Sequence, residues 1–215
     1  MKYRDRADAG KQLASMLNEH TGSDALVLAI PNGGIPVGIE ISKELQLELD
    51  VMITRRINLP FTTESGFGAV SFDGQLFIDK RMQDYYHIDN MQLARLVLEA
   101  EEQVKIKVSL FNFDKNKFDV EGKTVILVDD GIAGGFTMRV SLQMLEKYHP
   151  RKRIVAVPTA PARSVEKVRP WCDEIVCPDI KREARFAVAA AYRHWRDLHD
   201  QETARMFMDF RAEHG

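Results

Sequence analysis

The stretch Thr124–Thr137, with the sequence TVILVDDGIAGGFT, constrains the fold of this chain more than any other part. Its apolar run Val125–Val128 is typical of a strand that is buried on both faces of a parallel sheet. An acidic pair, Asp129 and Asp130, follows the run directly. Three glycines come next, and from Thr137 onward the apolar residues recur with a helical period. This order predicts a strand, a glycine-rich turn and a helix, which is the repeating unit of an α/β protein.

The same stretch has the chemistry of a site for a phosphorylated sugar. Glycines allow backbone N–H groups to approach an anion, and the start of a helix adds a partial positive charge. The carboxylates of Asp129 and Asp130 can accept hydrogen bonds from a vicinal diol such as that of ribose, and they can help to hold a divalent cation. An ordinary strand-to-helix turn is the alternative, because Asp and Gly are common turn residues. The combination of an apolar strand, a double Asp and three glycines favours the phosphosugar interpretation.

Two further segments supply groups that suit an anion. The apolar run Ala25–Ile30 predicts another buried strand, and it ends in Pro31–Pro36 (PNGGIP), a double-glycine turn before a helix. The run Leu49–Thr54 predicts a strand that leads to Arg55 and Arg56, whose guanidinium groups can donate paired hydrogen bonds to phosphate. The alternatives are an ordinary turn for the first segment and a solvated surface pair for the arginines.

The rest of the chain alternates helical and strand patterns around these segments. A long helix is predicted over 89–111, and its charged side chains, Lys107 among them, are expected to face solvent. Residues 58–68 are predicted to form a polar loop that leads into a hairpin. The further predicted elements are helices over 5–20, 162–169 and 200–212, hairpin strands over 67–72 and 75–78, and strands over 153–157 and 174–177.

Composition narrows the class of partner. The chain has 215 residues, 45% of them hydrophobic, and a net charge of −2, so neither a nucleic acid nor an acidic membrane surface is expected as a partner. No apolar run approaches the roughly 18 residues of a membrane span, and the N-terminus lacks the apolar core of a signal peptide, so a cytoplasmic location is expected. Cys172 and Cys177 have no further ligands at metal-site spacing and are predicted to be free thiols.

The glycine-rich segments resemble those of a known family. The stretch around Asp129 and Asp130 resembles the motif that binds phosphoribosyl pyrophosphate (PRPP) in the type I phosphoribosyltransferases, and Pro31–Pro36 resembles their pyrophosphate loop. The resemblance runs from Arg4 to Arg193, and it is closest to predicted phosphoribosyltransferases of unassigned substrate. It implies a three-layer α/β/α fold with a mainly parallel central sheet, a flexible loop and hairpin as a lid, and a small C-terminal hood. A single domain over 1–215 is expected, with the core over about 1–178 and the hood and last helix over about 179–215.

The resemblance also implies an activity and roles for named residues. The expected reaction transfers phosphoribosyl from PRPP to a nucleobase or other nitrogen acceptor, with Mg²⁺ and with release of pyrophosphate, in an enzyme that is expected to be a homodimer. Asp129 and Asp130 would be catalytic and would hold Mg²⁺ indirectly or through PRPP, and Glu64 on the lid would be a general base or lid contact. The expected contacts are Gly131, Ile132, Ala133, Gly134, Gly135, Phe136 and Thr137 for the 5′-phosphate, Asn32, Gly33, Gly34, Arg55 and Arg56 for pyrophosphate, and Phe186, Tyr192 and Trp195 for stacking on the base. Plain core or interface packing is the alternative for each of the three aromatic residues.

Three positions depart from the family pattern. Gly134 stands where the family usually has Thr or Ser, Phe136 where it has a small residue, and Asn32 where the closest group has Arg. Losing one hydrogen bond to a charged group removes on the order of 1.5–3 kcal/mol of binding. A non-catalytic regulatory module of the same fold that binds a nucleotide or PRPP is therefore the alternative function. A Rossmann-type nucleotide domain is disfavoured because no G-x-G-x-x-G follows a strand.

Overall fold

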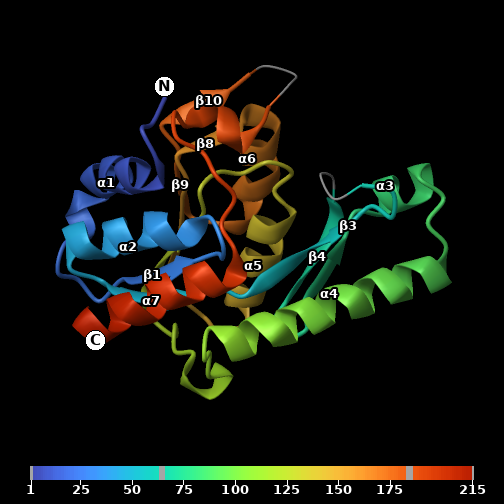
Figure 1. Ribbon diagram of the computed structural model, residues 1–215, viewed down its shortest axis with the longest axis horizontal. Coiled ribbons are helices and arrows are strands. Elements are labelled where there is room, and N and C mark those ends of the chain that lie inside the picture. The colour runs from blue at the N-terminus through green and yellow to red at the C-terminus, as the bar shows by residue number, and fades with distance from the viewer. Residues whose placement is uncertain (1, 63–65, 183–185, 215) are drawn as a thin grey trace.

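A five-stranded parallel sheet forms the centre of the molecule, with the strand order β2-β1-β6-β7-β9 (Figure 1). The structure is a computed structural model that describes residues 2–62, 66–182 and 186–214. The predicted buried strands are confirmed, and the mainly parallel α/β fold is confirmed with them. The strands are β1 (Leu26–Ala29), β2 (Glu48–Val51), β6 (Thr124–Val128), β7 (Lys152–Ala156) and β9 (Glu174–Val176).

Helices cover both faces of this sheet, which gives the predicted three layers. Successive residues of β1 alternate between two apolar clusters, because side chains of a strand point to opposite faces. Val27 and Ala29 pack with α1 (Arg6–Met16), α2 (Gly34–Leu45) and α7 (Asp200–His214). Leu26 and Leu28 pack with α5 (Phe136–Glu146) and α6 (Ala162–Val168).

A second, antiparallel sheet projects from the central body and carries the basic pair. It has the order β3-β4-β5, formed by β3 (Thr54–Asn58), β4 (Gly66–Ser71) and β5 (Leu76–Ile78). Together with α3 (Lys80–Tyr85) and α4 (Asn90–Leu110), these strands form a projection that we call the arm (Figure 1). The predicted hairpin and long helix are confirmed, and Asp89 caps α4 in a capping box with Gln92.

The predicted position of Arg55 and Arg56 at the end of a strand of the central sheet is wrong. The chain leaves that sheet after Val51, and both arginines lie inside β3. Arg55 is paired in register with Val70 and Arg56 with Ala69 of β4. The run of apolar residues across this point concealed the break between the two strands.

The carboxyl edge of the central sheet is covered by short segments that the sequence did not reveal. Strands β8 (Thr159–Pro161) and β10 (Asp179–Lys181) pair in parallel. Each has three residues, too few to show a strand period. The short helix η4 (Val188–Ala191) lies beside Tyr3, whose N–H donates to Ala191 O at 2.8 Å. The remaining short helices are η1 (Asn18–His20), η2 (Lys115–Lys117) and η3 (Arg169–Trp171).

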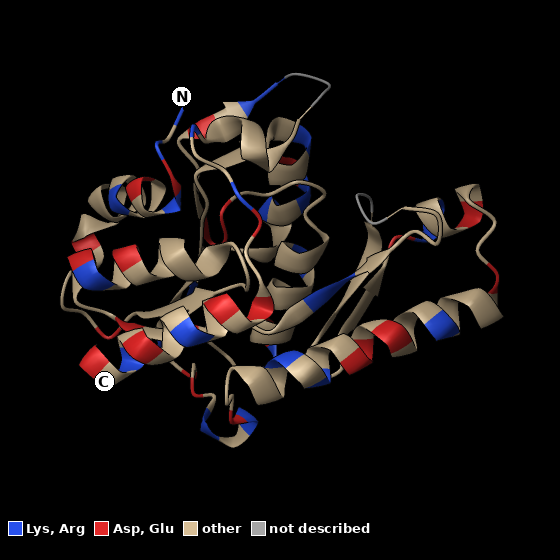
Figure 2. Ribbon diagram, viewed as in Figure 1, with Lys and Arg blue, Asp and Glu red and all other residues tan. Residues whose placement is uncertain are grey.

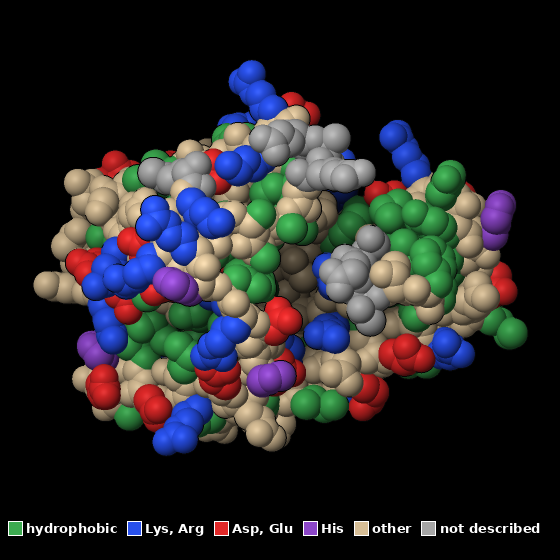
Figure 3. Space-filling view, turned by 45° about the horizontal axis from the view of Figure 1, so that its top comes forward, with side chains coloured by type: hydrophobic (Ala, Val, Ile, Leu, Met, Phe, Trp, Pro, Cys, Tyr) green, Lys and Arg blue, Asp and Glu red, His purple; other side chains and the backbone are tan. Residues whose placement is uncertain are grey.

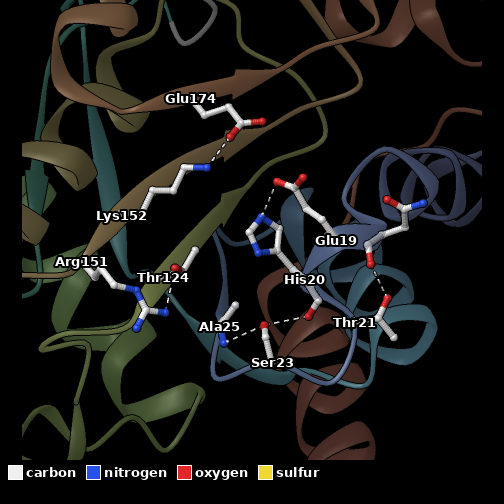
Figure 4. A network of polar contacts seen from close by, with 10 residues as sticks. Glu19, His20, Thr21, Ser23, Ala25, Thr124, Arg151, Lys152 and Glu174 are labelled. Carbon is white, nitrogen blue, oxygen red and sulfur yellow. Dashed lines mark hydrogen bonds and ion pairs between the residues drawn. The ribbon is translucent and has the colours of Figure 1, made fainter.

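The opposite, amino edge of the sheet is tied together by charged pairs (Figure 4). Arg151 donates to Thr124 at 3.2 Å, and Lys152 and Glu174 form an ion pair at 2.7 Å across the first residues of β7 and β9. Two further features were expected: Cys172 and Cys177 are free, and within the described ranges no helix is long and apolar enough to cross a membrane. These ion pairs therefore lie at the edge of the sheet opposite to the glycine loops and the acidic pair.

Candidate active site

The two glycine loops predicted from sequence meet at the carboxyl edge of the central sheet. Strands β1 and β6 are direct neighbours, with Ala29 opposite Val128, so the loops that follow them lie side by side. A Cβ atom at Gly33 would lie 2.0 Å from Asp130 Oδ2, and one at Gly34 would lie 2.6 Å from Val128 O. Only glycine fits at these two positions, because any side chain would separate the loop from the acidic pair.

Asp130 is held by the N-terminal helix and the C-terminal segment. Its carboxylate accepts a hydrogen bond from Arg6 Nε at 2.7 Å, and both residues are buried. The Arg6 guanidinium also donates to Arg196 O and lies 3.9 Å from the centre of the Trp195 ring. Tyr192 donates its hydroxyl to Asp130 O at 2.6 Å. These contacts make Asp130 part of the frame of the site.

Tyr192 therefore has a different place from the one predicted. It is 3% exposed and packs beside Tyr3. It is not among the residues that line the cavity bordered by the glycine loop after Asp130. Its hydroxyl supports the backbone of the acidic pair, which leaves no face of the ring for stacking on a base. Phe186 and Trp195 do line the cavity, as a hood residue must.

Asp129 and Asp130 both line the adjoining cavity, and Asp129 is the more exposed of the two. Its Oδ1 accepts a hydrogen bond from Asp130 N at 2.8 Å. Burial raises the pKa of Asp129 well above its ordinary value, and the neighbouring charge of Asp130 adds to this rise. Burial also raises the pKa of Asp130, but the Arg6 guanidinium opposes that shift. The Arg6 charge also opposes the rise in the pKa of Asp129, but among the described residues Arg6 forms its ion pair with Asp130 alone.

The glycine loop after Asp130 lines a cavity of about 530 Å³. Gly131 has a φ of 156° and Gly135 a φ of 82°, a region that glycine enters without a Cβ clash. All seven residues predicted for the 5′-phosphate line this cavity: Gly131, Ile132, Ala133, Gly134, Gly135, Phe136 and Thr137. The wall opposite the loop is formed by Phe186, Ala187, Val188, Ala189, Trp195 and Asp197.

Two departures from the family pattern depend on each other in this loop. A Cβ atom at Gly134 would lie 2.9 Å from the Phe136 ring, so a Thr or Ser at 134 would require the ring to move. The Phe136 ring in turn stacks on Phe77 of β5, with ring centres 6.2 Å apart. The aromatic residue thus joins the loop to the arm, and glycine at 134 makes room for it.

The basic pair faces a second cavity of about 310 Å³ beside the first. Arg56 and Thr137 line both cavities, so the arm and the glycine loop border one continuous region. Figure 2 shows the basic band on β3, and Figure 3 shows the surface hollowed between the arm and the rest of the molecule. The residues that line the second cavity are Pro31, Thr54, Arg55, Arg56, Asn58, Lys107 and Thr137.

Asn32 uses its side chain within the protein. Its amide donates to Asp200 Oδ1 at 2.7 Å and to Leu198 O at 2.9 Å, and it accepts from Lys107 Nζ at 2.9 Å. The pyrophosphate contact predicted for this residue is thus limited to its backbone. Glu64, the predicted lid residue, lies outside the described residues.

Sequence reasoning missed three charged residues at this edge: Arg6, Lys107 and Asp200. Lys107 was expected in solvent, but it is 3% exposed. Its spacing of three from Val104 and four from Phe111 places it on the apolar face of α4, and that signal was present in the sequence. Arg6 and Asp200 gave no comparable signal, because each acts on a residue more than a hundred positions away.

No group of three or more Asp, Glu, His or Cys side chains suited to a metal ion occurs in the part of the chain that the structure describes. Mg²⁺ is commonly bound by one or two carboxylates together with the phosphates of a substrate. Asp129, with Asp130 beside it, fits this binding of Mg²⁺ by carboxylates together with substrate phosphates. The described residues of the site therefore suit a metal that arrives with its substrate better than a resident one.

A family model described as a phosphoribosyl transferase domain matches residues 2–191. The chain belongs to the phosphoribosyl transferase family. A Mycobacterium tuberculosis protein, whose name assigns it provisionally to the phosphoribosyl transferases, is 32% identical over 208 residues, which are 96% of this chain. Those residues are 46% of that relative, so the chain spans less than half the length of the curated relatives it matches.

Two solved structures are similar to this chain. The crystal structure of TT1426 from Thermus thermophilus superposes with a TM-score of 0.78 at 29% identity, over 98% of this chain and 99% of that one. A hypoxanthine phosphoribosyltransferase from Staphylococcus aureus superposes with a TM-score of 0.50 at 14% identity, over 83% of this chain and 74% of that one. The second comparison shows the phosphoribosyl transferase fold alone.

Proposed function

We propose that this phosphoribosyl transferase domain binds PRPP with Mg²⁺ and transfers its phosphoribosyl group to a nitrogen acceptor, releasing pyrophosphate. The observation that carries the proposal is the meeting of three segments at one edge of the sheet. The glycine loop and the acidic pair border the larger of two adjoining cavities, and the basic pair borders the smaller one. A phosphorylated sugar with a pyrophosphate arm carries anionic groups that suit the loop and the cations, and hydroxyl groups that suit Asp129.

The glycine loop would bind the 5′-phosphate. The N–H groups of the first turn of α5 have no partners within that helix, and the helix dipole adds a favourable field for an anion. Thr137, the second residue of α5, can add its hydroxyl. The loop carries no Lys or Arg, so this binding depends on backbone groups.

The ribose and the metal would lie at Asp129. Its carboxylate can accept hydrogen bonds from the ribose hydroxyls or bind Mg²⁺, and both partners would favour its ionised form. Mg²⁺ would neutralise charge on the departing pyrophosphate. Asp130 would keep the loop in place through Arg6 and Gly33 without touching the sugar.

The reaction is a displacement at the anomeric carbon of the ribose. The bond from that carbon to the pyrophosphate oxygen breaks, a bond to the acceptor nitrogen forms, and the N–H proton of the acceptor passes to the released pyrophosphate or to water. The transition state places positive charge on the ribose and negative charge on the leaving group, so fixed charges at both ends lower the barrier. Asp129 would act on the sugar, and Arg55 and Arg56 on the leaving group.

The acceptor would enter beside Trp195 and Phe186. Both aromatic residues line the larger cavity on the side facing the glycine loop, together with Val188 and Asp197. A flat ring can stack on such a wall, which supports a nucleobase or another planar nitrogen compound as acceptor.

A regulatory module that binds PRPP or a nucleotide without turnover is the second candidate. The ion pair between Arg6 and Asp130 favours it, because one of the two carboxylates is already neutralised by the protein. Such a module would keep the phosphate and pyrophosphate contacts and lack catalysis.

One experiment separates these functions. The protein is incubated with PRPP, Mg²⁺ and a panel of nucleobases and amines, and pyrophosphate release is measured beside calorimetry with PRPP alone. Release that depends on both PRPP and an acceptor supports the transferase. Tight PRPP binding without release supports the module, and no binding at millimolar PRPP contradicts both.

A further inference from the structure

Lys107 is buried, although burial of a lysine side chain is energetically unfavourable. Its side chain extends from α4, is 3% exposed, and lies on the helix face that carries Val104. The ammonium group donates to Asn32 Oδ1 at 2.9 Å and lies 3.1 Å from Asp200 Oδ1. Burial lowers the pKa of Lys107, and the nearby charge of Asp200 opposes this shift. The protein thus keeps a cation in a place that disfavours charge.

The ammonium group has capacity for one more acceptor. A protonated lysine has three N–H donors, and Asn32 and Asp200 account for two of them. The third has no partner among the described residues. Lys107 lines the smaller cavity, so an acceptor placed there is within its reach.

The smaller cavity has the composition of an anion site. Its lining holds three cations, Arg55, Arg56 and Lys107, and no carboxylate among the described residues. Thr54 lines the same cavity, and its hydroxyl is buried without a hydrogen-bond partner in the described ranges. A buried polar group without a partner is uncommon in folded proteins and indicates a ligand or an ordered water.

We infer that Lys107 binds the pyrophosphate group in this cavity, that Thr54 donates to the same anion, and that Asp200 weakens the binding by competing for the Lys107 ammonium. The inference rests on the proposed function for the identity of the anion. It explains how the site functions with Asn32 at a position where an arginine was expected. Lys107 on α4 supplies the positive charge, and Asn32 orients the Lys107 ammonium group by accepting its hydrogen bond. Asp200 lies in α7, beyond residue 191, where the match to the family model ends.

The test uses calorimetry of the full chain with inorganic pyrophosphate, and separately with ribose 5-phosphate as a probe of the glycine loop. Lys107→Met is expected to weaken pyrophosphate binding about tenfold or more, as for one lost charge-assisted hydrogen bond. Its affinity for ribose 5-phosphate is expected to stay unchanged. Lys105→Met is the matched control, because Lys105 is exposed on the same helix and pairs with Glu102.

A second variant gives a result that a purely structural ion pair would not give. Asp200→Asn keeps an oxygen for Asn32 and Lys107 but removes the competing charge, so pyrophosphate binding is expected to tighten about threefold or more. If Lys107→Met fails to fold, the double variant Lys107→Met/Asp200→Asn, which removes both charges, carries the same expectation of weakened binding.

Several outcomes would overturn the inference. They are unchanged pyrophosphate affinity in folded Lys107→Met or in the double variant, no tightening in Asp200→Asn, and no pyrophosphate binding by the wild-type protein. Failure of the proposed function is seen separately: a wild-type protein that binds pyrophosphate through Lys107 but neither binds nor turns over PRPP refutes the transferase and leaves this anion site in place.

Discussion

The two carboxyls of the acidic pair are adjacent in sequence and have different surroundings. Both line the larger cavity, but Asp130 is buried against Arg6 and Gly33, whereas Asp129 forms no ion pair among the described residues and its pKa is raised well above the ordinary value. A carboxylate whose ionised form is disfavoured in the free protein and favoured by a bound ligand lowers the stability of the free protein. The sequence DD alone shows none of this division.

The raised pKa of Asp129 makes the stability of the free protein depend on pH. Between the ordinary pKa near 4 and the raised one, the folded state binds more protons than the unfolded state, so the free energy of unfolding falls as pH rises through that window. Asp129→Asn removes this loss. The variant is expected to be more stable than wild type at about pH 7, with a smaller difference at about pH 4.

Urea denaturation at a series of pH values measures the effect. Asp119→Asn, which removes an exposed carboxylate, controls for the loss of one acidic group and is expected to show no such trend. A stability difference between Asp129→Asn and wild type that stays constant with pH would contradict the assignment.

The ion pair between Arg6 and Asp130 gives a second prediction at this scale. Arg6→Met leaves a buried carboxylate without its partner, and such losses lower the free energy of unfolding by about 3–5 kcal/mol. Arg6→Met/Asp130→Asn is expected to recover much of that loss, because no buried charge remains. Denaturation at neutral pH measures both variants, and Arg4→Met is the exposed control. If the double variant were as unstable as the single one, the packing of Arg6, and not its charge, would be what stabilises this part of the protein.

At the scale of elements, the loop between β1 and α2 is fitted to the acidic pair through glycine. Gly33→Ala would place a methyl group 2.0 Å from Asp130 Oδ2, and Asp130 is too firmly held by Arg6 and Tyr192 to yield. The variant is expected to lose about 1–3 kcal/mol of stability, the usual range for overpacking, and to lose most of its PRPP affinity.

Gly22→Ala is the control at a glycine away from the site, because Gly22 precedes β1 whereas Gly33 follows it. Gly22 has a φ of 65° with nothing near its added Cβ, so the expected loss is about 1 kcal/mol of strain with PRPP affinity unchanged. Calorimetry and thermal unfolding of both variants measure the contrast. Wild-type PRPP affinity in Gly33→Ala would contradict the close fit of the two loops.

The elements that the sequence predicted are those with local signals. The strand Thr124–Val128, the following helix and the capped helix α4 each carry their own period and boundary residues. Strands β8 and β10 have three residues each and composition typical of turns, so no period could reveal them. The glycine loops were predicted for the same local reason, whereas the roles of their residues came from the resemblance to a known family.

The parts that could not be predicted depend on contacts between distant segments. The partner of Asp130 is 124 positions away, and the partners of the Asn32 amide lie in or beside α7. The displacement of Arg55 and Arg56 into the arm follows from pairing with β4, which the residues around them do not encode. Long-range pairing of this kind is a property of the whole fold.

At the scale of the whole molecule, the central body and the arm share the candidate site. The body contributes the acidic pair and the glycine loops, and the arm contributes the basic pair and Lys107. Phe136 and Phe77 connect the two parts at the edge of the cavities. A ligand that contacts both parts is therefore expected to stabilise the molecule as one unit.

Calorimetry of PRPP with Mg²⁺, on wild type and on Asp129→Asn, tests the account most directly. Wild type is expected to bind PRPP, and Asp129→Asn is expected to bind it at least about tenfold more weakly although the variant is the more stable protein at neutral pH. Loss of binding together with a gain in stability marks a residue kept for its ligand. Equal PRPP affinity in the two proteins, or no binding by wild type at millimolar PRPP, would contradict the account.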